Sequence, residues 1–92
     1  MESNVYIKDK DYSVYVSSCL LVMRKNDGLV KMMARGSYVK PALDVLAILL
    51  RDYVDDSDYS CDVKSEKFNE KWVTALEINL KGKIRKKDGD KR

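Results

Sequence analysis

The sequence predicts an α/β fold whose elements follow the order β-α-β-α-β-β. Three observations lead to this order. Between residues 12 and 24, apolar side chains recur at three- and four-residue steps, which indicates one face of a helix. A second, almost wholly apolar helical segment follows Pro41. Residues 71–80 alternate strongly between the two faces of a strand, and a shorter alternating run precedes them, which is typical of a hairpin.

The first half of the chain supplies two strands and the first helix. The β-branched and aromatic run Asn4–Ile7 predicts a strand, and Leu29–Ala34 predicts a central one because it is apolar at nearly every position. Between them, the helix expected over Tyr12–Arg24 can be capped by a carboxylate of the preceding loop, Asp9 or Asp11. Gly28 permits a left-handed turn after this helix.

The second helix carries more apolar surface than a single sheet can cover. Pro41 is tolerated in its first turn, and the helix is expected to end at about Tyr53 or Val54. Its apolar residues spread around most of the circumference, whereas a helix on one face of a sheet needs one stripe. We therefore expect the surplus to be buried against a second copy of the chain.

The last third predicts a hairpin and a basic extension. The acidic run Asp55–Asp58 is expected to be a loop that separates the helix from the hairpin. Two strands should then meet at a turn near Phe68 and Asn69. Beyond Gly82 the residues are almost all charged, so we expect a frayed tail. The predicted division is a folded domain over 1–80 and a basic tail over 81–92.

The net charge of +3 is unevenly distributed along the 92 residues. Of eighteen basic and fifteen acidic residues, seven and two lie in 81–92, so this segment carries +5 and residues 1–80 carry −2. Attraction to polyanions must therefore come from local patches or from the tail. A chain of this length is expected to form one domain.

Composition also argues against several classes of function. The chain has no histidine, no glycine-rich phosphate loop and no evident nucleophile–base pair, so we predict no catalytic residues, no metal site and no cofactor. Cys19 falls in an apolar helical pattern and is expected to be a buried reduced thiol, although a disulfide with Cys61 is left open. Asp55, Asp56 and Asp58 suit a solvated loop better than a cation site.

No apolar run is long enough to span a membrane, and the N-terminal residues lack the layout of a signal peptide. We therefore expect an intracellular protein without a membrane partner.

Several of these residues together resemble the Alba family, small proteins of archaeal chromatin with relatives among eukaryotic RNA-binding proteins and ribonuclease P subunits. The resemblance is carried by "NVYI", by "YV" in the first helix, by "ARG" at 34–36, by "VKPALD" opening the second helix, and by "TALEI" at 74–78. It covers about Val5 to Tyr53 and resumes at Thr74.

The resemblance implies a two-layer domain with a mixed four-stranded sheet and two helices. It also implies a dimer that binds DNA or RNA, mostly without sequence specificity, in the cytoplasm and associated with the chromosome. The dimer would use the second helix and the last two strands, and the hairpins would act as arms. Arg35 matches the family arginine on the nucleic-acid face, and the fork of its guanidinium suits a phosphate.

The expected nucleic-acid-binding residues include three further lysines near Arg35 and three residues of the hairpin tip. They are Arg35, Lys10, Lys8, Lys40, Lys67, Phe68 and Lys71. The family loop Gly-Lys-Lys-Pro is Lys-Asp-Lys-Asp here, with Asp9 in place of the first family lysine, and the hairpin is shorter than is common in the family.

Each expected contact has an alternative. Arg35 can instead pair with Asp9 or Asp11 at the surface, and Lys8 and Lys10 can simply be solvated between carboxylates. Trp72 can stack on bases or pack in the core or at an interface. The main functional hypothesis is a dimeric, nonspecific nucleic-acid-binding protein of chromatin type. The alternatives are an interaction module with weak nucleic-acid affinity, acting for example as a heterodimer, or an RNA-binding subunit of a ribonucleoprotein.

Overall fold

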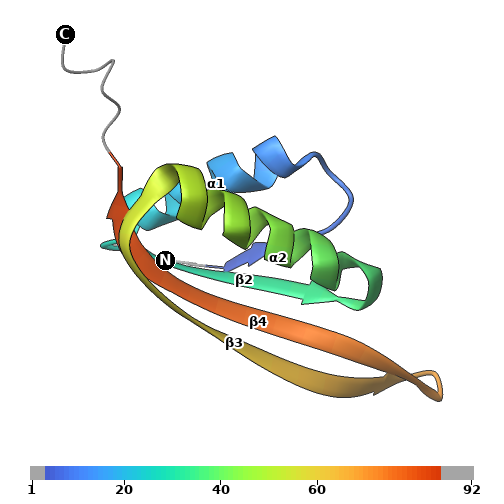
Figure 1. The fold of residues 1–92 in the computed structure, drawn as a ribbon. Helices are drawn as coiled ribbons and strands as arrows, with labels where there is room; N and C mark the ends of the chain where they lie inside the picture. Colours follow the sequence, from blue (N-terminus) through green and yellow to red (C-terminus); the bar gives the residue numbers. More distant parts are fainter. Residues whose placement is uncertain (1–3, 86–92) are drawn as a thin grey trace, which may run out of the picture.

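The computed structural model describes residues 4–85 and shows one four-stranded sheet with two helices on one face (Figure 1). The elements are β1 (Asn4–Tyr6), α1 (Tyr12–Lys25), β2 (Leu29–Arg35), α2 (Val39–Ile48), β3 (Val54–Phe68) and β4 (Lys71–Ile84). The strand order is β1-β2-β4-β3, with β1 parallel to β2 and the other neighbours antiparallel. The predicted element order and the mixed sheet are confirmed.

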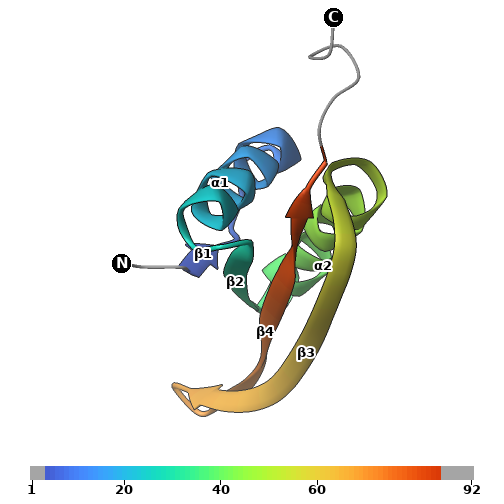
Figure 2. The same cartoon turned by 90° about the vertical axis from the view of Figure 1, so that its left-hand side faces the viewer.

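The core lies between the helices and the inner face of the sheet. In α1 the predicted apolar face is buried at Tyr15, Val16, Cys19 and Met23, whereas Tyr12 at the first turn is exposed. The inner face of β4 contributes Leu76, Ile78 and Leu80, as its alternation predicts. Figure 2 shows the two helices on the same side of the sheet, so no helix formed by residues 4–85 covers the other face.

The second helical segment reaches Tyr53 as predicted, but its last turn is wider than an α-helix. Regular α-helix ends at Ile48, and a π-helical turn spans Leu49–Tyr53 before β3 begins. Leu49 in this turn is fully buried. The turn therefore keeps an apolar side chain in the core while the chain reverses into the hairpin.

The acidic run is not a loop but the first part of β3. Asp55 lies opposite Lys83 and Asp58 opposite Lys81, with a bulge between the two pairs where Asp56 takes a positive φ of 52°. Arg85 adds a salt bridge to Asp55 at 2.9 Å. Attraction between these carboxylates and these lysine and arginine side chains favours pairing of the two strands, although the acidic composition of the segment alone suggested a loop.

The same cross-strand pairs extend β4 past Leu80, so the predicted boundary between the domain and the tail falls inside this strand. This strand continues to Ile84, which lies opposite Val54, so residues 81–84 are paired strand and not a frayed tail. The rest of the predicted tail, residues 86–92, lies outside the described residues.

The turn of the hairpin lies where the sequence predicted it. Asn69 and Glu70 connect β3 to β4, and both have positive φ, at 48° and 67°. Two consecutive residues of this kind form the turn whose twist matches that of the flanking strands.

The two thiols are both free, and they differ in environment. Cys19 is completely buried, and this burial raises the pKa of its thiol to about 12. Cys61 is exposed on β3. The prediction of a buried, reduced Cys19 is confirmed, and an ionised, reactive form of this thiol is disfavoured at neutral pH.

Two glycines allow the α1–β2 turn to lie against the end of β4. Gly28 has a φ of 84°, and its carbonyl accepts a hydrogen bond from the Gly82 N–H at 3.0 Å. A Cβ on Gly28 would overlap the Gly82 carbonyl oxygen, which is backbone and cannot move aside alone. Close approach and a left-handed conformation therefore both require glycine at this position.

Replacing Gly28 should therefore destabilise the fold. We expect Gly28→Ala to lower the free energy of unfolding by about 1–3 kcal/mol, because it combines backbone strain with overlap. Urea denaturation followed by circular dichroism measures this. Ser17→Ala, on the exposed face of α1, is the control and should stay within about 0.5 kcal/mol of wild type. Equal stability of all three proteins would contradict the assigned role of Gly28.

Candidate nucleic-acid interface

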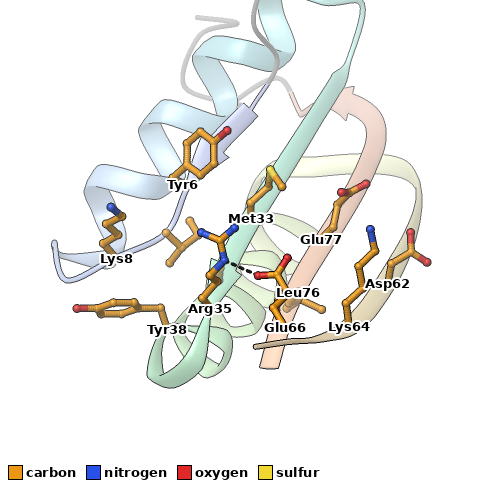
Figure 3. Close-up of a pocket in the computed structure, with 13 residues that line it drawn as sticks. Tyr6, Lys8, Met33, Arg35, Tyr38, Asp62, Lys64, Glu66, Leu76 and Glu77 are labelled. Atoms are coloured by element: carbon orange, nitrogen blue, oxygen red, sulfur yellow. Dashed lines mark hydrogen bonds and ion pairs between the residues drawn. The ribbon is translucent and has the colours of Figure 1, made fainter. Parts of the chain in front are cut away.

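Three segments meet at the end of the sheet where β2 stops. They are the loop between β1 and α1, the turn between β2 and α2, and the part of the hairpin opposite them. Figure 3 shows the cavity that they form, of about 290 Å³, with Lys8 and Tyr38 on one side and Asp62, Lys64 and Glu77 on the other. Arg35 lies between these groups. The structure therefore brings two of the expected site residues, Lys8 and Arg35, to the same cavity.

Arg35 is the last residue of β2, and its side chain contacts the hairpin. Its Nε donates a hydrogen bond to Glu66 Oε1 at 2.8 Å, and its guanidinium lies 5.4 Å from the centre of the Phe68 ring. The surface pairing with Asp9 or Asp11, considered as the alternative, is replaced by a pairing with β3. Gly36 follows with a φ of 57°, which allows the tight turn into α2.

The loop that carries Lys8 and Lys10 is held by one buried hydroxyl. Tyr15 Oη accepts hydrogen bonds from the backbone N–H of Lys8 at 2.8 Å and of Lys10 at 3.1 Å. The position of the loop is therefore set by α1, while both lysine side chains stay exposed. Lys8 lines the cavity with Arg35, whereas Lys10 lines a neighbouring groove along α1. Asp11 occupies the expected cap position but its side chain caps nothing.

Lys40 belongs to a separate cluster on the helices. Its Nζ lies 2.9 Å from Asp44 Oδ2, and Tyr12 Oη donates to the same oxygen at 2.7 Å. The hydrogen bond to Asp44 raises the pKa of Lys40, and the bonds from Tyr12 and then Lys40 lower the pKa of the Asp44 carboxyl. Lys40 remains charged and exposed, but it does not line the cavity that Lys8 and Arg35 share.

The hairpin tip presents aromatic rings together with lysines. Lys67 Nζ lies 5.8 Å from the centre of the Trp72 ring, and Phe68 lies opposite Lys71. Trp72 is 69% exposed, although its position in the alternation places it on the inner face of the sheet. Residues 71–74 pair only with β3, beyond the end of β2, and no helix covers them. Neither core packing nor an interface within the single chain accounts for Trp72.

Sequence reasoning missed three residues of this region: Glu66, Tyr6 and Glu77. The contact of Glu66 with Arg35 could not be predicted from local sequence, because the two residues lie 31 positions apart in the chain. Tyr6 and Glu77 point to the helix-free face of the sheet, and the alternation of β1 and β4 could have indicated this face.

Among residues 4–85, no group of three acidic or sulfur-bearing side chains is arranged to hold a metal ion. Within the same range, no helix combines the length and the apolar character needed to cross a bilayer.

Comparison with solved structures identifies the arrangement. Alba from Thermoplasma volcanium superimposes with a TM-score of 0.69 and 20% identity, over 85% of this chain and 98% of that chain. The chain has the Alba fold. A second match, ALBA1 from Trypanosoma brucei, gives a TM-score of 0.72 and 13% identity, over 90% of this chain and 71% of that chain. No protein-family model matches the sequence, and no curated protein sequence is significantly similar to it.

The resemblance to Alba proteins noted in the sequence is thus confirmed at the level of the fold. With identities of 20% and 13%, the likeness concerns architecture and does not assign individual residues. The roles of the candidate side chains depend on the geometry of this chain.

The pairing of Arg35 with Glu66 makes a specific prediction. A phosphate that contacts Arg35 must compete with the Glu66 carboxylate, and an exposed ion pair of this kind contributes at most about 1 kcal/mol. Glu66→Gln should therefore increase affinity for nucleic acid by about two- to fivefold in fluorescence anisotropy.

The matched control is Glu70→Gln, which removes the same charge from the hairpin turn, where Arg35 makes no contact. An equal increase for both variants would mean that only net charge matters and that Glu66 does not compete at Arg35.

Proposed function

We propose that this protein binds DNA or RNA through the phosphate backbone, without sequence preference, as a dimer. The observation that carries the proposal is the convergence of Lys8 and Arg35 at one cavity next to a hairpin tip rich in lysines and aromatic rings. The Alba fold and the family resemblance in the sequence support it. A location in the cytoplasm with the chromosome belongs to the same proposal.

The fixed cations give a modest electrostatic site. Arg35 and Lys8 line the cavity, Lys10 lies two residues further along the same loop at a neighbouring groove, and Lys40 is exposed beside Asp44. Each phosphate that such a side chain neutralises releases counterions, which is the main source of nonspecific affinity. Because residues 1–80 carry −2, we expect weak binding with a strong dependence on salt.

The hairpin supplies a second type of contact. Its tip projects beyond the helices (Figure 1) and carries Lys67, Phe68 and Lys71. Aromatic rings next to ammonium groups suit a strand of nucleic acid, because the rings stack on bases and the cations contact phosphates. Trp72 joins this set because it is exposed at the same tip.

A dimer is favoured by apolar residues on the side of the molecule away from α1. Asp44 of α2 is hydrogen-bonded to α1. At 3.6 residues per turn, Leu43 and Ala47 lie about 100° and about 60° around the helix from Asp44, both in the same sense. Both are exposed. On β3, Tyr59 and Val63 lie opposite buried Leu80 and Leu76, so they share the inner face of the sheet, yet they are 51% and 68% exposed. Covering such groups with a second copy removes apolar surface from water.

A second candidate function is an interaction module with weak nucleic-acid affinity. Arg35 and Lys40 each pair with a carboxylate. This pairing favours the interaction module, because it leaves less unpaired positive charge to attract a polyanion. In that case the apolar side of α2 and β3 would bind another protein chain, for example a different Alba-type subunit, or place the chain in a ribonucleoprotein. The following experiments separate the two candidates.

The first experiment measures salt dependence. Arg35→Ala should lower affinity similarly for all sequences and reduce the slope of log affinity against log salt by about two in a dimer on duplex DNA. The matched control is Arg24→Ala, an exposed arginine at the far end of α1. Truncation after Arg85 keeps all of β4 and removes four of the basic residues.

Anisotropy titrations across salt compare the four proteins. Truncation should flatten the slope as well, without changing sequence preference. If Arg35→Ala matches wild type while truncation abolishes binding, the folded domain does not contact the nucleic acid, and the interaction module is the better function.

The second experiment tests the dimer. Leu43→Glu places a charge on the apolar side of α2 and should convert the dimer to a chain of 10.6 kDa in sedimentation equilibrium at micromolar concentration. Leu21→Glu on α1 is the control, since Leu21 is even more exposed, at 52% against 43%. A monomeric wild type, or dissociation by both variants alike, would refute the proposed interface.

A further inference from the structure

The cavity at the end of the sheet has features that phosphate binding does not use. It opens on the helix-free face, where Met33 and Ala75 supply the apolar side chains of its lining. Its volume of about 290 Å³ is at the lower end of the range for small-molecule pockets. A phosphate group gains nothing from contact with apolar side chains, so this lining fits a ligand that also has a flat apolar part.

The charges around the cavity are divided between its two sides. Lys8 and Arg35 lie on the side of β1 and β2, whereas Asp62, Glu66 and Glu77 come from the hairpin strands. With Lys64 the lining holds three cations and three carboxylates, so it is not simply a polyanion site. A ligand that is anionic at one end and rich in hydrogen-bond donors at the other matches this division.

Two of the carboxylates lie directly opposite each other. Asp62 pairs in register with Glu77, and like charges in that position destabilise a sheet. Glu77 Oε2 accepts a hydrogen bond from Asn79 and lies 3.5 Å from Lys31 Nζ, while no hydrogen bond among the described residues uses Oε1. Both side chains therefore retain acceptor capacity toward the cavity.

An aromatic side chain stands at the rim. Tyr6 is 55% exposed, comes from β1 opposite Met33, and lines the cavity with Lys8 (Figure 3). Open four-stranded sheets that carry exposed aromatic rings bind unpaired bases by stacking, and backbone phosphates then lie on nearby cations.

We propose that this cavity holds one unpaired base of a single-stranded nucleic acid. The base stacks on Tyr6 over the apolar lining, its exocyclic amino group donates to Asp62 and Glu77, and the adjoining phosphates contact Lys8 and Arg35. The inference deepens the proposed function and rests on it. Cytosine is favoured over uracil, because uracil presents a carbonyl oxygen where cytosine presents the amino group.

The experiment compares two single strands that differ only at this edge of the base. Fluorescence anisotropy with labelled 12-nucleotide oligo(C) and oligo(U) RNA should give about tenfold tighter binding to oligo(C). Both bases are pyrimidines, so the comparison holds ring size constant. A mixed-sequence duplex of equal length, whose base edges are already paired, reports phosphate binding alone.

Carboxylate variants test the assigned donors. The double variant Asp62→Asn with Glu77→Gln should remove the preference for oligo(C) while affinity for the duplex stays the same or rises. The matched control is Asp27→Asn with Asp56→Asn, which removes the same charge at exposed positions whose positive φ asparagine tolerates. The control variant should show the same ratio of oligo(C) affinity to oligo(U) affinity as the wild type.

Tyr6 variants test stacking. Tyr6→Ala should weaken single-strand binding by about fivefold or more and leave duplex binding unchanged, whereas Tyr6→Phe keeps the ring and should match wild type. Circular dichroism confirms that each variant is folded.

The outcomes distinguish the two levels of the proposal. Equal affinity for oligo(C) and oligo(U), with salt-dependent duplex binding retained, would overturn the base site and leave the phosphate function standing. An equal effect of Tyr6→Ala on single strands and duplex would also overturn it. Absence of binding to every nucleic acid would refute the proposed function and the base site together.

Discussion

The length difference between the hairpin and the helices determines most of what this molecule exposes. A strand of 14 residues such as β4 spans about 46 Å, whereas the 10 residues of α2 span about 15 Å. The helices can bury only the part of the sheet that they reach, and there Leu76, Ile78 and Leu80 form the core. Beyond the reach of the helices, inward-facing and outward-facing residues of β4 still alternate, but no helix in the described part of the chain covers the inner face there. Trp72 and the other tip residues are exposed for this reason.

Where the helices end, weak surface pairs replace the core as the means of holding the hairpin. Arg35 of β2 contacts Glu66 and Phe68 of β3 across the intervening strand β4, and Lys67 contacts Trp72. Ion pairs between exposed groups contribute little to stability and exchange readily with solvent and ions. The same side chains can therefore position the hairpin in the free protein and contact an anionic ligand in the bound one. If these pairs were buried, the side chains could position the hairpin but could not also contact a ligand.

The sequence predicted periodic elements better than pairings between distant segments. The alternation from Trp72 to Leu80 identified a strand, and the spacing from Tyr15 to Met23 identified a buried helix face, because both patterns are local. The acidic run at 55–58 was misinterpreted because its strand character depends on Lys81, Lys83 and Arg85. The partner of Arg35 and the separation of Lys40 from the cavity depend on tertiary geometry in the same way.

The outer edge of β3 has a consequence for how the protein behaves at high concentration. Among residues 4–85, β3 pairs with β4 on one side only and is 15 residues long, so the backbone groups of its other edge could template a strand from another molecule. Charged side chains recur along it, among them Asp58, Asp62 and Lys64, and the bulge at 55–58 bends its first part. Charges and bulges of this kind oppose edge-to-edge pairing. The hairpin can therefore remain extended without becoming a seed for aggregation.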